Sequence, residues 1–202
     1  MTQTIERPNT RSRLIAAMIN GLRTRGYHGV GLNALLATAQ APKGVLYHHF
    51  PGGKSELAVH AIESVVERLG TDLEKVIKRT GDPVGALEAW MSGAQKVLEK
   101  SGFDSGCPLA TIALESTADD QTIRKALATA FEQLRAQISS SLATTGMTHA
   151  MAQSFAALII SAYEGALLQA RVSGSGVIMK ETSETLIGLI RMSLREPKEF
   201  QD

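Results

Sequence analysis

The sequence is poor in cysteine and in aromatic residues. Cys107 is its one cysteine among 202 residues, and aromatic residues make up 4% of the chain. A single cysteine excludes an internal disulfide framework and is typical of a reducing compartment. His60 and His149 lack ligand partners at metal spacing, and the side chains of His48 and His49 diverge on a helix. We therefore expect no metal site and no cofactor.

Long apolar runs are missing as well. No segment approaches the roughly 20 uninterrupted apolar residues of a membrane helix. The first eight residues also lack the apolar run of a signal peptide. With 44% hydrophobic and 20% charged residues, the composition is that of a globular protein, which we expect in the cytoplasm.

The charge is unevenly distributed along the chain. The formal net charge is only +1, but residues 1–60 carry seven basic and two acidic side chains. The remaining residues carry 14 basic and 18 acidic side chains. A basic N-terminal third on a faintly acidic body indicates that one end of the molecule faces a polyanion.

Apolar residues recur with helical periodicity through the whole chain, and no run alternates as a strand does. The pattern predicts an all-α fold of about nine helices. Gly/Pro breaks place these helices near residues 8–25, 32–38, 42–49, 54–80, 83–100, 108–117, 120–144, 148–173 and 180–195.

The segment 41–54 is the most informative part of the sequence. Pro42 suits the first turn of a short helix, which Pro51-Gly52-Gly53 then ends. This helix follows the equally short helix 32–38 across a tight break. Two short helices in this order are typical of a helix-turn-helix, whose second helix enters the major groove of DNA.

The predicted reading helix separates an inner face from an outer face. Val45 and Leu46 are expected to face inward, with Phe50 closing a small core. The residues left on the outer face are Lys43, Gly44, Tyr47 and His48. A glycine within a helix costs about 1 kcal/mol relative to alanine, which a close approach of the backbone to DNA would explain.

Further groups are expected to contact phosphates. Lys54 lies where the next helix begins, so its ammonium group and free backbone N–H groups can bind one phosphate together. Asn33, near the start of helix 32–38, is a second such residue. The alternatives are that Tyr47 and Phe50 are core aromatics and that His49 packs or caps. Four arginines form either a solvated basic face or, near the helix start, a phosphate contact: Arg11, Arg13, Arg23 and Arg25.

The stretch Leu46-Tyr47-His48-His49-Phe50 followed by Lys54 resembles the DNA-binding domain of the TetR family of bacterial repressors. The resemblance covers residues 10–58. It implies that Lys43, Tyr47, His48 and Lys54 touch an operator. It also implies a DNA-binding domain over residues 1–53 and an effector-binding and dimerisation domain over 54–202. The segment Gly-Cys-Pro-Leu-Ala at 106–110 resembles a drug-responsive subgroup of efflux repressors.

A repressor needs a ligand site, and most aromatic residues fall in the C-terminal body. A small hydrophobic effector is expected to contact residues that are otherwise ordinary core: Trp90, Met91, Phe103, Cys107, Leu109, Ile112, Phe131, Phe155 and Tyr163. Polar groups for the same ligand are Trp90, Gln95, Glu115 and Tyr163. Residues 150–172 and 180–195 mix small with large apolar side chains, which predicts a two-fold symmetric dimer interface.

The sequence disfavours two other classes of function, a phosphate-binding loop protein and an enzyme. Gly53-Lys54-Ser55 is no phosphate-binding Walker loop, because His48 stands where that loop needs a glycine. No convergent polar constellation indicates an enzyme. The hypothesis is a homodimeric repressor on a palindromic operator, released by a small hydrophobic ligand. The alternatives are control by a partner protein or through oxidation of Cys107, or an all-α carrier protein.

Overall fold

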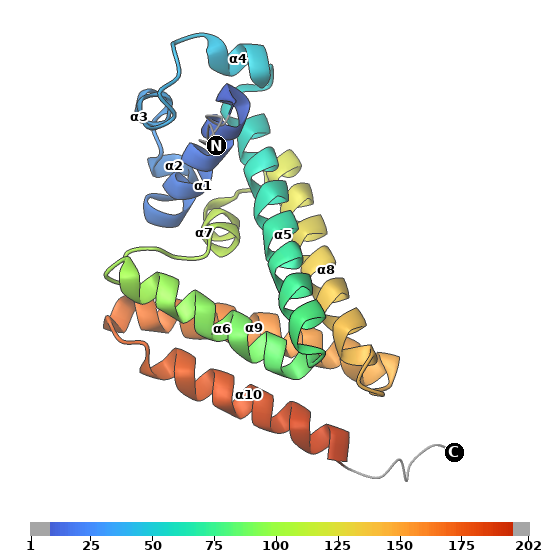
Figure 1. Ribbon diagram of the computed structural model, residues 1–202. Coiled ribbons are helices and arrows are strands. Elements are labelled where there is room, and N and C mark those ends of the chain that lie inside the picture. Colours follow the sequence, from blue (N-terminus) through green and yellow to red (C-terminus); the bar gives the residue numbers. More distant parts are fainter. Residues whose placement is uncertain (1–8, 196–202) are drawn as a thin grey trace, which may run out of the picture. The chain divides into compact units, whose positions relative to one another are not determined.

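The structure, a computed structural model, describes residues 9–195, and these form ten helices and no strand (Figure 1). The helices are α1 (Thr10–Thr24), α2 (Gly26–Gly29), α3 (Leu32–Thr38), α4 (Val45–His49), α5 (Gly53–Thr80), α6 (Pro83–Lys100), α7 (Pro108–Glu115), α8 (Gln121–Ala143), α9 (His149–Ser173) and α10 (Val177–Arg195). The predicted all-α fold is confirmed.

Two of the predicted boundaries are wrong. The helix α2 occupies a stretch predicted as a connection, because Gly26 at φ +74° lets the chain turn directly out of α1 into a further turn of helix. The reading helix α4 begins at Val45 and not at Pro42. Gly44 has φ +94°, a left-handed conformation that cannot continue a right-handed helix. Gly44 is thus the residue before the helix, so it does not lower the helix propensity of α4.

The chain divides into two compact units. The first unit comprises residues up to 65 together with 107–130, and the second comprises 66–106 together with the chain from 131 onward. The division passes through α5 and α8, so each of these helices contributes to both units. The predicted domain boundary after residue 53 falls inside the first unit, at the beginning of α5.

The first unit surrounds a core built by α1, α3, α4 and the beginning of α5. The Asn9 side chain caps α1 by accepting a hydrogen bond from Ser12 N–H at 2.8 Å, which fixes where this helix begins. Large side chains from these four helices and from Phe50, directly after α4, are buried: Leu14, Met18, Leu22, Leu35, Leu46, Phe50, Leu57 and Ile62.

The second unit packs parts of α5, α6, α8, α9 and α10 around its own core, which includes Leu73, Leu87, Leu142, Ile159 and Ile190. By length and composition alone, α9 is apolar enough to cross a membrane. One side of α9 is used in this core, through buried residues such as Ala152, Ala156 and Ile159. Other apolar residues of the same helix remain exposed.

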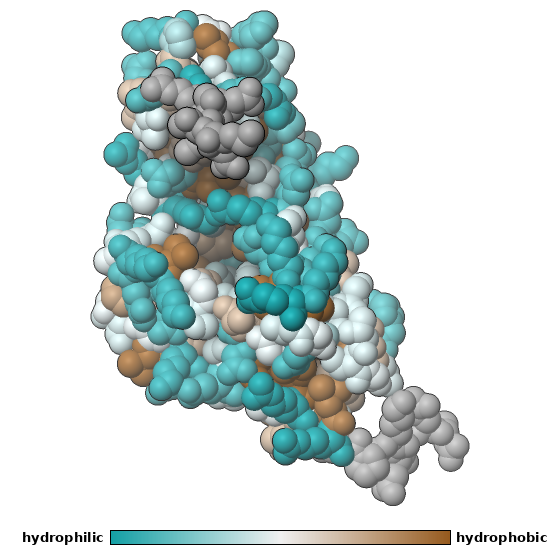
Figure 2. Space-filling view, viewed as in Figure 1, coloured by the Kyte–Doolittle hydropathy of each residue, from teal (hydrophilic) through white to brown (hydrophobic). Residues whose placement is uncertain are grey.

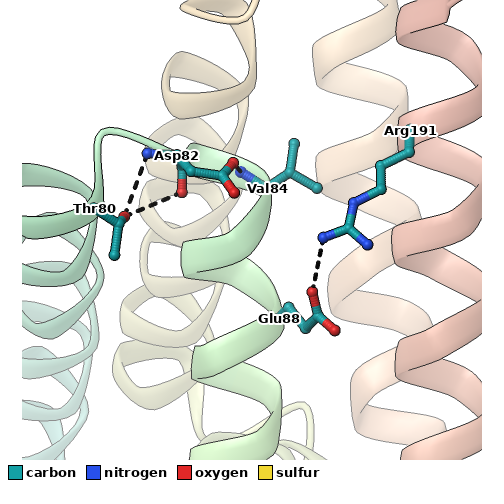
Figure 3. A network of polar contacts seen from close by, with 5 residues as sticks. All are labelled: Thr80, Asp82, Val84, Glu88 and Arg191. Atoms are coloured by element: carbon teal, nitrogen blue, oxygen red, sulfur yellow. Dashed lines mark hydrogen bonds and ion pairs between the residues drawn. The ribbon is translucent and has the colours of Figure 1, made fainter.

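Polar contacts fix the turn between α5 and α6 (Figure 3). Asp82 caps α6 by accepting a hydrogen bond from Val84 N–H at 3.0 Å, and Thr80 Oγ1 accepts one from Asp82 N–H at 3.3 Å. Further along α6, Glu88 pairs with Arg191 of α10 at 2.9 Å. Both charged side chains are about half exposed, so this ion pair adds at most about 1 kcal/mol. The apolar core therefore holds α6 and α10 together.

Gly21 of α1 leaves the space that the side chain of Val30 occupies. A β-carbon at position 21 would lie 2.5 Å from Cγ2 of Val30, a buried and stiff side chain. Gly21→Ala is therefore expected to lower the free energy of unfolding by about 1 kcal/mol, since overpacking outweighs the gain in helix propensity. The control is Gly93→Ala in α6, where a β-carbon meets nothing within 4 Å and a gain of about 0.5–1 kcal/mol is expected. Denaturant unfolding measures both, and a gain at both positions would contradict this packing.

Candidate nucleic-acid interface

The turn between α3 and α4 gives the helix-turn-helix its geometry. It contains two left-handed residues, Gln40 at φ +49° and Gly44 at φ +94°. Ala41 N–H donates to the carbonyl oxygen of Leu36 at 2.9 Å, which closes the end of α3. The turn therefore has a defined conformation, and α4 projects from it.

The two faces of α4 differ in burial as the sequence predicts. Leu46 and Phe50 are buried, and Val45 is half-buried. Tyr47 is 58% exposed, so it is not a core aromatic. The other residues predicted to contact DNA from this segment, Lys43, Gly44 and His48, are exposed, as is Asn33 at the start of α3. Their contact with DNA stays a prediction. Tyr47 and His48 lie on α4, Lys43 and Gly44 lie in the turn before it, and Asn33 lies on α3.

His49 lies at the edge of this surface. Its ring is half-buried and meets the rings of His48 and Phe50 edge to face, with centroid separations of 5.0 and 6.4 Å. This placement agrees with the packing role among the predicted alternatives. The guanidinium of Arg11 lies over the Phe50 ring, 5.2 Å from its centre.

Lys54, at the beginning of α5, is half-buried and is held by an aromatic ring. Its Nζ lies 4.6 Å from the centre of the Tyr27 ring, a cation–π contact. Burial lowers the pKa of Lys54, and the nearby Glu115 carboxylate opposes that shift. The ammonium group therefore lies against the ring of Tyr27 in α2.

Glu115 is a residue whose role sequence reasoning missed. It was expected to be a polar group for a ligand, but its carboxylate accepts a hydrogen bond from His28 N–H at 2.8 Å. A β-carbon on Gly26 would overlap this carboxylate, so the glycine is required here. Glu115 ends α7 and thereby ties the 107–130 segment to α2. No local pattern signals a contact between residues 87 positions apart.

The α7–α8 turn adds a second carboxylate to this region. Asp120 Oδ2 accepts hydrogen bonds from the backbone N–H and the hydroxyl of Thr117, at 2.8 and 2.9 Å, which lower the pKa of Asp120. The same carboxylate acts on Tyr27, whose pKa is raised chiefly by burial and further by this charge.

The nine predicted ligand residues do not lie in one compact unit. Cys107, Leu109 and Ile112 belong to the first unit. The second unit holds the other six: Trp90, Met91, Phe103, Phe131, Phe155 and Tyr163. The rings of Trp90 and Tyr163 lie 4.6 Å apart, and Phe131 and Phe155 pack half-buried against the core of that unit.

Two buried hydroxyls of α8 were not anticipated. Ser139 and Ser141 are 5% and 9% exposed, and their oxygens have no hydrogen-bond partner in the structure. Buried polar atoms are nearly always paired, so these two are unusual. They lie in the second unit, as do Trp90 and Tyr163.

Among the residues that the structure describes, no group of three or more His, Cys, Asp or Glu side chains is arranged to hold a metal ion. The first unit presents a short helix with an exposed polar face after a closed turn, and Lys54 follows at the beginning of the next helix. This arrangement defines a helix-turn-helix DNA-binding protein.

Comparison with known proteins gives the family. Residues 14–61 match the model of bacterial regulatory proteins of the tetR family. Residues 83–185, half of the chain, match the C-terminal domain of LmrA/YxaF-like transcriptional regulators. The chain therefore belongs to the TetR family of transcriptional regulators, with a C-terminal domain of the LmrA/YxaF type, and it is a DNA-binding regulator rather than an enzyme.

Individual proteins agree with this assignment. The HTH-type transcriptional regulator LmrA of Bacillus subtilis is 24% identical over 91% of this chain and 97% of LmrA. The regulator YxaF of the same organism is 27% identical over 80% of this chain and 85% of YxaF. A TetR transcriptional regulator from Legionella pneumophila superposes with a TM-score of 0.81 at 19% identity, over 92% of this chain and 99% of that one. The reduced form of NemR from E. coli superposes with a TM-score of 0.73 at 25% identity, over 88% and 94% of the two chains.

The conformation of Gly44 generates a prediction. A β-carbon at position 44 meets nothing within 4 Å, so any cost of substitution comes from the backbone alone. Gly44→Ala is expected to destabilise the folded chain by about 1–2 kcal/mol, and Gly44→Asn by less, because asparagine tolerates left-handed conformations better. Thermal unfolding followed by circular dichroism compares the two variants. Equal losses would mean that φ at this position is not the constraint.

Proposed function

We propose that this regulator is a homodimeric repressor that reads a palindromic operator with α4 and leaves it when a small hydrophobic ligand binds. The observation that carries the proposal is the exposure of Tyr47 and His48 on α4, with Lys43 exposed just before it, while Leu46 and the C-cap residue Phe50 are buried. A repressor of this kind acts on the chromosome, so it works in the cytoplasm.

Each exposed group has a chemistry that suits DNA. Tyr47 and His48 supply a hydroxyl and an imidazole for phosphates and a ring for a thymine methyl group. Lys43 supplies a point charge for a phosphate or a guanine edge. Lys54 and Asn33 contact the flanking phosphates and so fix the position of α4 in the groove.

Exposed apolar side chains on α9 and α10 support the dimer. Met151, Leu158 and Val172 of α9 are exposed. Together with Gly165 they lie at seven-residue intervals, and a β-carbon at Gly165 would meet nothing within 4 Å. Seven residues make two helical turns, so these four positions form one stripe. Exposed apolar residues continue on α10: Val177, Leu189, Met192 and Leu194. On the face drawn in Figure 2, hydrophobic atoms are exposed among hydrophilic ones over the α6 and α10 helices.

A second copy of the chain fits this face best. Large exposed apolar patches mark sites of protein association, and a glycine in the stripe permits close approach of a partner helix. Two helices from each protomer form a four-helix interface with two-fold symmetry. That symmetry sets two α4 helices against two half-sites, about 34–36 Å or a multiple apart.

The ligand proposal rests on the second unit. Its half-buried rings, Trp90, Phe131, Phe155 and Tyr163, border an apolar core, and Ser139 and Ser141 bring unpaired hydroxyls into the same unit. Apolar surface with a few polar groups is the usual composition of a small-molecule site. In this proposal the ligand acts through α5, which contributes to both units, and a coupling free energy of about 1–3 kcal/mol suffices.

Control through Cys107 is the second candidate. Cys107 is half-buried and stands at the N-cap of α7, where the helix dipole favours a thiolate. It shares α7 with Glu115, which bonds to α2, so a change at this thiol has a route to the DNA-binding segment.

The reading surface is tested by two substitutions. Lys54→Ala is expected to weaken binding to operator and scrambled DNA alike and to reduce the salt slope by about one unit, because it removes one phosphate contact. Tyr47→Ala is expected to weaken operator binding by about 1–3 kcal/mol and to weaken binding to scrambled DNA less, because its contact with a thymine methyl group is made only on the operator. Fluorescence anisotropy at two salt concentrations measures both. If both variants bound like the parent, the assignment of α4 as the reading helix would be wrong.

The dimer face is tested with a matched pair of charge insertions. Leu158→Glu places a carboxylate in the proposed interface and is expected to convert the dimer to a monomer, because an unpaired charge is costly to bury. Leu114→Glu makes the same change on α7, where the side chain is 78% exposed, and is expected to leave the dimer intact. Analytical ultracentrifugation gives the masses. A Leu158→Glu variant that stays dimeric would place the interface elsewhere.

A further inference from the structure

The turn of the helix-turn-helix contains a residue in an unfavourable conformation. Gln40 has φ +49°, in the left-handed region where a side chain with a β-carbon is disfavoured. Gly44, the other left-handed residue of this turn, is a glycine and tolerates its conformation. Two backbone hydrogen bonds within the turn support this conformation, from Gln40 N–H to the Ala37 carbonyl at 3.0 Å and from Ala41 N–H to the Leu36 carbonyl at 2.9 Å. Because a β-carbon still disfavours it, contacts from outside the turn add to its stability.

The side chain of Arg13, from α1, supplies such contacts. Its Nε–H donates to the carbonyl oxygen of Ala39 at 2.9 Å, and Nη2 approaches the carbonyl oxygen of Gln40 at 3.5 Å. Nη2 also donates to Thr10 Oγ1 at 3.3 Å, which orients the guanidinium from its own helix. One planar group thus joins α1 to two successive carbonyls of the turn.

The carbonyl of Ala39 needs a partner, whereas that of Gln40 belongs to an exposed residue. Ala39 is the C-cap of α3. The last carbonyl groups of a helix accept no hydrogen bond from within that helix. Ala39 is 2% exposed, so water has little access to this residue. A guanidinium at the end of a helix satisfies such carbonyls and interacts favourably with the helix dipole.

We propose that Arg13 is a positioning residue for DNA recognition: it keeps Gln40 left-handed and thereby fixes the direction in which α4 leaves α3. It does so without touching DNA. This assigns Arg13 a role different from that of a solvated or phosphate-binding arginine. The proposal rests on the proposed reading surface of α4, since the position of α4 matters only if α4 reads the groove.

The chemistry requires arginine rather than any cation. The guanidinium presents donors in a fixed planar fork, so it can reach two adjacent carbonyls at once. A lysine ammonium is a point charge on a flexible stem and gives no comparable fork. A phosphate contact, by contrast, is served by either residue. Arg13→Lys therefore separates the two roles.

The first experiment uses the full-length protein and operator duplexes of about 30 base pairs, three helical turns, selected from random DNA by the parent protein. Arg13→Lys and Arg13→Met are each expected to weaken operator binding about tenfold or more, because bonds between a charged donor and the turn are lost. Binding to scrambled DNA and the salt slope are expected to stay at the parental values. Lys43→Met is the comparator for a phosphate contact and is expected to lower the salt slope by about one unit.

Two results would overturn the proposal. Parental operator affinity in Arg13→Lys would show that a point charge suffices. A salt slope lowered by about one unit in Arg13→Met, with equal losses on both DNAs, would show a phosphate contact.

The second experiment relieves the backbone strain at Gln40 and then tests whether the Arg13 contacts still matter. In a Gln40→Gly background the left-handed turn needs no restraint, so Arg13→Met is expected to cost less operator affinity than it does in the parent. Without DNA, hydrogen exchange of the amides of residues 39–46 is expected to accelerate in Arg13→Met and to accelerate less in the double variant. Equal losses in both backgrounds, or exchange unchanged by Arg13→Met, would contradict the proposal.

The two proposals fail in different ways. If Tyr47→Ala keeps full operator binding, the reading surface is wrong, and the exchange measurement still decides whether Arg13 restrains the turn. If Tyr47→Ala loses operator binding and Arg13→Met does not, the reading surface stands and the role of Arg13 is refuted.

Discussion

The burial of Phe50 and Leu46 is the constraint on which the recognition surface depends. The helix α4 has five residues, far fewer than an isolated helix needs to be stable in water. Its conformation therefore comes from its neighbours: Phe50 and Leu46 are anchored in the core of the first unit. Because these two side chains take one face of so short a helix, the exposed face is fixed as well. Tyr47 and His48 have no alternative orientation that keeps the core intact.

A second constraint acts on the same helix from its N-terminal side. The turn before α4 contains a strained glutamine and a glycine that cannot be replaced without backbone cost. A reading helix anchored at one end by apolar burial and at the other by a closed turn loses little conformational freedom when it binds. Preorganisation of this kind raises affinity without adding contacts.

The sequence predicted the longer elements well because their signals are local. Apolar periodicity bounded by Gly and Pro predicts helices over 54–80 and 83–100, and α5 and α6 occupy nearly the same residues. The start of α4 was misjudged because two local rules compete there. Proline favours a first helical turn, but the left-handed Gly44 interrupts the helix two residues later. The inner and outer faces of α4 were still predicted correctly, since they depend on periodicity and not on where the helix starts.

What the sequence could not predict are contacts between distant positions. The bond from His28 to Glu115 and the ring of Tyr27 beneath Lys54 join segments that no periodicity relates. The same holds for Arg13. The sequence indicated a surface charge or a phosphate contact, whereas its guanidinium bonds to the carbonyls of residues 39 and 40. Folding brings a carbonyl without a partner in its own helix next to one particular arginine, and only the three-dimensional structure identifies that arginine.

The interleaving of the first unit limits how this protein can be taken apart. Its two stretches of chain, up to residue 65 and 107–130, share one core and the bond between Glu115 and α2. A fragment cut after residue 53 would carry every group proposed to face DNA except Lys54, yet it would lack α7 and leave the His28 N–H without its carboxylate. Exchange of the whole first unit between regulators of this type therefore requires three crossover points rather than one: after residue 65 and at both ends of the segment 107–130. A recombinant that inherits only the N-terminal stretch receives an interface evolved for a different α7.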